Sequence, residues 1–114
     1  KDGLQIDIEK YTETKSKLNR SIKNFFSSFN KNTIFIFPAI PNSAPAGLES
    51  TGEPKYIAPW TALSGPIVSC STGLDDNKMP VGILLCGHPF KDRFLSNFCL
   101  DIYNKSEYFS GLKL

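Results

Sequence analysis

Cys86 and His88 form a candidate pair for nucleophilic catalysis in this 114-residue chain. They stand two residues apart, across a glycine at the end of a predicted strand, so their side chains would have to fold back on each other to share a proton. His88 is also the only histidine, which excludes a multi-histidine metal site and leaves no further base for a histidine-dependent triad. We therefore expect a structural role for His88.

Two aspartates and three cysteines could also bind a cation or react, but each set is better explained by a structural role. Asp75 and Asp76 resemble a carboxylate pair, but adjacent acids in a polar turn are usually solvated. Cys70, Cys86 and Cys99 are odd in number, lie in apolar stretches and form no close-spaced pair. We expect reduced, buried cysteines of a cytoplasmic protein, with no metal and no organic cofactor.

The composition is that of an ordinary globular protein, with 40% apolar and 21% charged residues. The longest apolar runs, 34–37 and 81–86, are much shorter than the roughly 20 residues that cross a bilayer. A net charge of +2, spread along the chain, does not predict nucleic-acid binding. Because the chain begins at Lys1 and its one methionine is Met79, we expect a part of a larger protein.

The first element expected is an amphipathic helix over residues 7–30, with Asp7 as its N-cap. Glu9 and Glu13 interrupt the positive charge of its polar face, which favours a solvated helix over a membrane-binding or partner-binding surface. Its apolar residues recur at spacings of three, four and seven: Ile8, Tyr11, Leu18, Ile22, Phe25, Phe26 and Phe29.

A strand buried on both faces is predicted at 33–37, followed by an ordered surface loop over residues 38–59. The loop holds five prolines and two glycines, too many for regular structure. Ordered loops of this length are often functional and commonly line a binding site.

Two further buried strands are predicted at 66–71 and 81–86, joined by a polar turn at 75–78. A last helix is expected over 91–104 with Asp92 as its cap, and the final ten residues are expected to form a weakly ordered tail. Two helices cannot cover both faces of such a sheet, so this pattern also predicts a part of a larger α/β protein.

The order of glycines and prolines around the apolar runs of segment 60–90 resembles the C-terminal signature of the amidase-signature hydrolases. The likeness covers roughly residues 7–103 and is strongest over 50–90. The matching residues near the strands are Pro66, Ile67, Val68, Ser69, Gly73, Pro80, Val81, Gly82, Gly87, Pro89 and Phe90. Those before them are residues 35–39, then Ser43, Ala44, Pro45, Gly47, Leu48, the run 50–54, and Pro59, Trp60 and Thr61.

The resemblance implies that residues 1–114 are the C-terminal portion of one amidase-signature domain, incomplete on its own, in an α/β/α sandwich with a mixed central sheet. It implies hydrolysis of a non-peptide C–N bond to a carboxylate and ammonia or an amine. The family does this with a serine, a second serine in a cis peptide and a lysine, in a dry pocket with a Gly/Ser-rich loop. None of the serines in this chain lies in such a loop, and Ser27 and Ser28 lie on a predicted helix surface. We therefore expect no catalytic residue in this chain.

The same resemblance implies that this chain contacts a small amide substrate through Pro59, Trp60 and Thr61, with Gly52 and Glu53 as weaker candidates from the same loop. Trp60 is equally well explained as a core residue. The expected partner is the remaining N-terminal part of the enzyme or a complementary chain, and homo-oligomers are left open.

Two departures from the family pattern bear on the subfamily and the pocket. Pro54 and its neighbours stand where the tRNA amidotransferases of the family usually have a Tyr and an Asp, which disfavours that activity. Residues 70–73 replace the usual Val-Pro-Cys-Gly and remove a rigid proline. The alternative function is a non-catalytic module or separate subunit that completes a partner protein.

Overall fold

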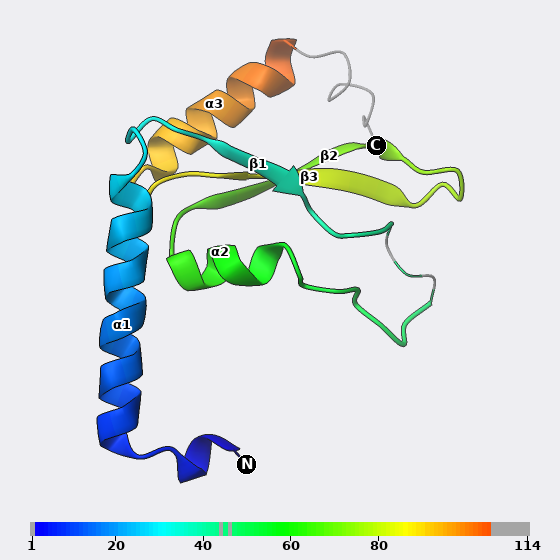
Figure 1. Cartoon of the computed structure of the whole chain (residues 1–114). Coiled ribbons are helices and arrows are strands. Elements are labelled where there is room, and N and C mark those ends of the chain that lie inside the picture. The colour runs from blue at the N-terminus through cyan, green and yellow to red at the C-terminus, as the bar shows by residue number, and fades with distance from the viewer. Residues whose placement is uncertain (1, 44, 46, 106–114) are drawn as a thin grey trace. The chain divides into compact units, whose positions relative to one another are not determined.

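The computed structural model describes residues 2–43, 45 and 47–105 of the chain (Figure 1). Ala44 and most of the predicted tail, residues 106–114, lie outside the described residues. The chain divides into two compact units, Lys1–Lys31 and Asn32–Leu114. In chain order the elements are η1 (Asp2–Gln5), α1 (Ile8–Ser27), β1 (Phe35–Pro38), α2 (Ile57–Leu63), β2 (Ile67–Leu74), β3 (Pro80–Cys86) and α3 (Asp92–Lys105).

The first unit consists of η1 and the predicted amphipathic helix, α1. The carboxylate of Asp7 caps it by accepting a hydrogen bond from the backbone N–H of Glu9, at 3.5 Å. At the other end the hydroxyls of Ser27 and Ser28 donate to the carbonyl of Asn24, at 2.9 and 3.0 Å. The predicted position of these two serines on an exposed helix surface is confirmed. Among the described residues, no helix combines the length and the hydropathy that a bilayer crossing requires.

The second unit is built on a three-stranded antiparallel sheet in the order β1-β3-β2. Leu84 of β3 pairs with Phe37 of β1 on one side and Ser69 of β2 on the other. All the described strand pairs are antiparallel, so the fold agrees with an α/β protein while the predicted mixed sheet is not confirmed. Figure 1 shows α2 and α3 on opposite sides of this sheet.

The sequence predicted that β1 would be buried on both faces, and this prediction is wrong. Ile36 is 58% exposed, because β1 is an outer strand and α3 contacts only β2 and β3 extensively. The central strand is buried instead: Leu84, Leu85 and Cys86 are each at most 2% exposed. A short continuous run of apolar residues does not distinguish an outer strand from a central one, since both carry the same residue types.

The helix α2 lies where the prediction had the end of a loop and the residues just after it. Pro59 looked like a helix breaker, but it lies in the first turn of α2, where the backbone N–H groups need no intrahelical partner. The backbone N–H of Ala58 donates to the carbonyl of Pro54 at 2.9 Å, which starts the helical turn. Ser64, in the left-handed conformation with φ 59°, ends it.

The polar turn after β2 and the helix α3 follow the prediction, but β2 is not the buried strand that was predicted. It is an outer strand, so every second residue near its middle, including Ser69 and Ser71, is exposed. The strands β2 and β3 come so close at Gly82 that a Cβ atom there would lie 2.7 Å from the carbonyl oxygen of Cys70. Asp92 is the first residue of α3 and not the cap before it, so its negative charge lies in the first turn, where the helix dipole favours it. The buried residue of α3 is Leu95, at 1% exposed.

Candidate functional site

A groove lies between the long loop and the sheet in the second unit. We call it the loop groove, and its volume is about 330 Å³. It is lined by Ala39, Ile40, Thr51, Gly52, Glu53, Pro54, Ile57, Ser69 and Leu84. Two neighbouring hollows share some of these residues, one of about 260 Å³ under the loop and one of about 180 Å³ beside Ser71 and Gly82.

The loop above this groove is held at two places. The backbone N–H of Gly52 donates to the hydroxyl of Ser50 at 3.1 Å, in a turn that gives Gly52 a φ of 88°. Farther along, the hydroxyl of Ser43 hydrogen-bonds to the carboxylate of Asp75 in the β2–β3 turn. The loop is therefore attached to the hairpin through Ser43, a contact that the sequence did not predict.

Asp75 organises the turn between β2 and β3. Its carboxylate accepts hydrogen bonds from the backbone N–H groups of Asn77, at 2.9 Å, and Met79, at 2.8 Å. The bond from Ser43 and then the bond from Met79 hold the pKa of the Asp75 carboxyl below its ordinary value. Within the described part of the chain, no three His, Cys, Asp or Glu side chains lie close enough to hold a metal ion.

The floor of the loop groove is apolar, and its polar groups are few. Ile40, Ile57 and Leu84 supply aliphatic surface, while Ser69 and Glu53 add a hydroxyl and a carboxylate. Among the described lining residues there is no lysine or histidine that could activate a serine. The groove can hold a small, partly apolar molecule, but its lining does not supply a catalytic base of the family's kind.

The four predicted substrate contacts have different positions. Gly52 lines the loop groove. Trp60 is 4% exposed, with its ring centroid 5.0 Å from that of Phe35 and 5.1 Å from that of Phe37. Pro59 and Thr61 are exposed on α2, where the Thr61 hydroxyl donates to the carbonyl of Ile57 at 3.2 Å.

The two lining residues that come from the sheet, Ser69 and Leu84, were not singled out for a site by the sequence, and Ile40 and Ile57 were included only through the predicted loop 38–59. The available signal was weak: Ser69 and Ser71 lie two residues apart and so on the same face of β2. Which face of the sheet the loop covers depends on the pairing of the strands, and the local sequence does not determine that pairing.

The candidate pair Cys86 and His88 is buried. His88 is 5% exposed and lies beside Phe35, with 6.3 Å between ring centroids. Burial raises the pKa of the Cys86 thiol to about 11. At neutral pH only on the order of one thiol in ten thousand would then be the reactive thiolate. The structural interpretation of this pair is favoured.

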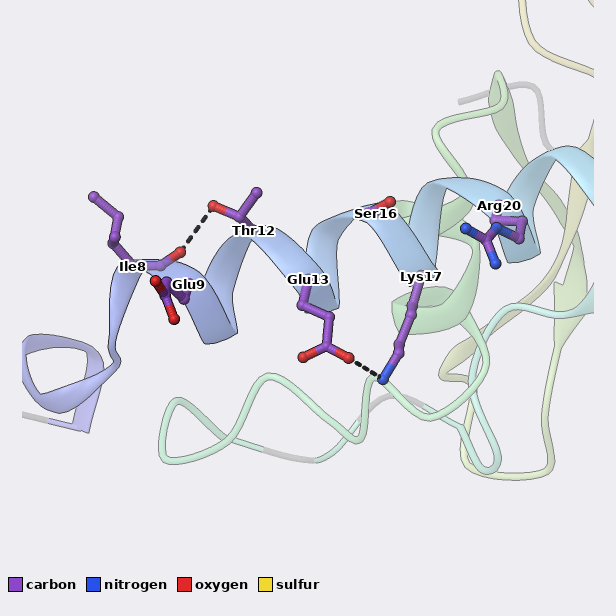
Figure 2. A pocket seen from close by; sticks show the side chains of 7 residues that line it. All are labelled: Ile8, Glu9, Thr12, Glu13, Ser16, Lys17 and Arg20. Atoms are coloured by element: carbon purple, nitrogen blue, oxygen red, sulfur yellow. Dashed lines mark hydrogen bonds and ion pairs between the residues drawn. The ribbon is translucent and has the colours of Figure 1, made fainter.

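A larger hollow, of about 580 Å³, runs along the surface of α1 (Figure 2). The described residues lining it all come from that helix: Ile8, Glu9, Thr12, Glu13, Ser16, Lys17 and Arg20. Figure 2 shows Glu13 and Lys17 joined in an ion pair, at 2.7 Å between Oε1 and Nζ. Both side chains are about two-thirds exposed, so this is an ordinary solvated pair on a helix surface.

Comparison with known proteins supports the resemblance seen in the residues. The chain is 27% identical to human fatty-acid amide hydrolase 2 over 94 residues, which cover 80% of this chain and 18% of that protein. It is 32% identical to a glutamyl-tRNA(Gln) amidotransferase subunit from Agathobacter rectalis over 78 residues, 62% of this chain and 16% of that protein. No family model and no solved structure matches the chain.

Both relatives are amidase-signature enzymes, so the predicted resemblance to that family is confirmed. Their names describe two different activities, and the similarity therefore supports the family more than any one substrate. The matched segments span less than a fifth of the length of either relative.

Proposed function

We propose that this chain is part of an amide hydrolase that cleaves the C–N bond of a small, non-peptide amide or carbamoyl compound. The products are a carboxylate and ammonia or an amine. The observation that carries the proposal is the similarity to two amidase-signature enzymes over 80% and 62% of the chain. The apolar loop groove, with its few polar groups, supports a role in holding a small substrate.

The catalytic serine, the cis-serine and the lysine belong, in this proposal, to a part of the protein outside these residues. The described serines lie on helices, strands and the loop, and none of the described lining residues of the groove is a lysine that could act as the base. This chain would contribute strands, a covering helix and one wall of the substrate pocket. Alone, it would be inactive.

Gly52, Pro59, Trp60 and Thr61 are the proposed substrate contacts. The geometry supports Gly52 most directly, because it lines the groove, and Trp60 least, because its ring is packed between two phenylalanines. Trp60 would then act by holding α2, and with it Ile57, against the groove.

The test is ammonia release from a panel of small primary amides, measured for the natural protein that contains this sequence and for residues 1–114 alone. We expect turnover from the first and none from the second. Turnover by the 114-residue chain that disappears when one of its own serines is changed to alanine would overturn the proposal. So would a parent sequence without a Gly/Ser-rich segment and a lysine before it.

A pair of matched variants tests the proposed contact at Thr61. Thr61→Val in the natural protein should raise KM several-fold and leave the fold intact. Thr12→Val is the control, because Thr12 is also an exposed helical threonine whose hydroxyl donates to the carbonyl four residues earlier, at 2.8 Å. Equal KM values for the two variants would remove Thr61 from the proposed site.

The alternative, a non-catalytic module that completes a partner protein, predicts the same exposed sheet edges. The two proposals differ in the parent sequence and in activity. A natural protein without amide turnover, which restores a property of a second chain on mixing, would favour the module.

A further inference from the structure

Cys70 and Cys99 come together where α3 packs on the sheet. Cys70 lies in β2 opposite Ile83 of β3, and α3 contacts both of these strands. Cys99 follows the fully buried Leu95 by four residues, so it lies on the same face of α3 one turn later. Ser69 lines the loop groove, so Cys70, the next residue of β2, faces the opposite side of the sheet, where its side chain interacts with that of Cys99.

Both thiols are free and only half-buried, which leaves them within reach of small reagents. Cys86 differs from these two cysteines in its position, its burial and its pKa. It pairs with Phe35 in the register of β1 and β3, it is fully buried, and burial raises its pKa to about 11. Two of the three cysteines therefore form a cluster, and the third does not belong to it.

We propose that Cys70 and Cys99 form a reversible disulfide that ties β2 to α3 when the protein meets a low-molecular-weight disulfide such as oxidised glutathione. The inference does not depend on the proposed amide hydrolysis. It requires that the two sulfur atoms lie close enough to bond without a large backbone movement, which the packing of α3 on β2 and the interaction between the two side chains support.

The reaction is two successive thiol–disulfide exchanges. Cys70, as thiolate, attacks one sulfur of oxidised glutathione and releases one glutathione thiolate. Cys99 then loses its proton, attacks the Cys70 sulfur of the mixed disulfide and releases the second glutathione. The two protein thiols are oxidised, one glutathione disulfide is reduced to two thiols, and the two protein protons end on the released thiolates.

Cys70 is assigned the first attack because of the environment of Cys99. Burial, and then the neighbouring Cys70 thiol, raise the pKa of Cys99 above its ordinary value. The second exchange is intramolecular, so the high effective concentration of Cys99 at the mixed disulfide offsets its raised pKa.

The disulfide would close the chain from residue 70 to residue 99 into a loop. Constraining a loop of this size in the unfolded state should raise the melting temperature by more than about 5 °C. In effect, oxidation would fix α3 against the sheet.

The experiment is peptide mapping of the unaltered chain after incubation with oxidised glutathione. Trypsin separates the three cysteines, because cleavage after lysine and arginine places them in peptides 56–78, 79–91 and 94–105. We expect a cross-link between the first and third peptides, reversed by dithiothreitol, with Cys86 unmodified.

The same reaction in concentrated urea is the control for chance pairing. In an unfolded chain the closures 70–86 and 86–99 are shorter than 70–99 and should be favoured over it by roughly threefold. A native sample dominated by either shorter closure, or one that carries only glutathione adducts or does not react, would overturn the proposal.

Single variants provide a second measurement. Cys70→Ser should accumulate a glutathione adduct at Cys99, and Cys99→Ser should accumulate one at Cys70. Both variants should lose the rise in melting temperature. Cys86→Ala should keep the cross-link. If Cys86→Ala abolishes the cross-link in a chain whose circular dichroism is unchanged, the assignment of the pair is wrong.

Discussion

Trp60 shows how one residue can fit two interpretations from sequence. An aromatic residue after a proline-rich loop suits a pocket wall as well as a core, and the residue type does not decide between them. The structure places the ring between Phe35 and Phe37 of β1, with 4% of the residue exposed. Its main contribution is therefore to the packing of α2 on the sheet.

Trp60→Ala should lower the free energy of unfolding by about 3–5 kcal/mol, because it removes a large buried side chain and leaves a cavity. Trp60→Phe should lower the free energy of unfolding by less, and it replaces the alanine variant in the test if that variant does not fold. Because Trp60 is the only tryptophan, urea unfolding should be followed by circular dichroism. Thr61→Ala, exposed in the same helix, should stay within about 0.5 kcal/mol. Equal losses at the two positions would contradict the core assignment.

The β2–β3 hairpin and the loop that lies beside it are linked by one side chain. Asp75 closes the turn through backbone N–H groups and also accepts a hydrogen bond from Ser43 in the loop. The polar turn at 75–78 was predictable, since Asp, Asn and Lys side by side between two apolar runs are typical of turns. The bond to Ser43 was not, because the two residues are far apart in sequence.

These bonds make the stability of the hairpin depend on pH. The pKa of Asp75 is lower in the folded chain than its unfolded value of about 3.9. Its contribution is therefore fully present above that unfolded pKa and is lost as the pH falls through the folded pKa. Urea midpoints measured at about pH 6 and about pH 3 should differ less in Asp75→Asn than in the unaltered chain. Asp76→Asn keeps the bonds of Asp75 and should behave like the unaltered chain; an equal change in both variants would contradict the assignment.

At the scale of the whole molecule, the sheet has two outer strands, β1 and β2, and several large apolar side chains are exposed. Ile36 is 58% exposed on β1, and Leu48 and Phe90 have almost all of their surface in solvent. Unpaired strand edges and exposed apolar surface promote association. These features agree with the proposal that a larger protein or a partner covers them.

Ile36→Lys should therefore reduce self-association of the isolated chain, measured by sedimentation velocity at concentrations on the order of 100 µM in reducing buffer. Ile8→Lys is the matched control: Ile8 is 77% exposed, but its backbone belongs to a helix and offers no strand edge. A larger effect of the control, or a chain that is monomeric before any substitution, would contradict the role of the β1 edge.

The sequence by itself determined the features that depend on neighbouring residues. The spacing of Ile8, Tyr11 and Leu18 and the cap at Asp7 predicted α1, the cluster around Asp75 predicted the turn, and the ordered glycines and prolines of 60–90 predicted the family. These signals act within a few residues of each other, so one chain is enough to interpret them.

Only the tertiary structure decided what depends on contacts between distant segments. It made β3 the central strand and left Ile36 exposed, it placed Trp60 on the side of the sheet that β1 presents to α2, and it brought Cys70 next to Cys99. Strand order and the covering of each face follow from the packing of the whole unit, because the same apolar run is stable in the centre of a sheet or at its edge.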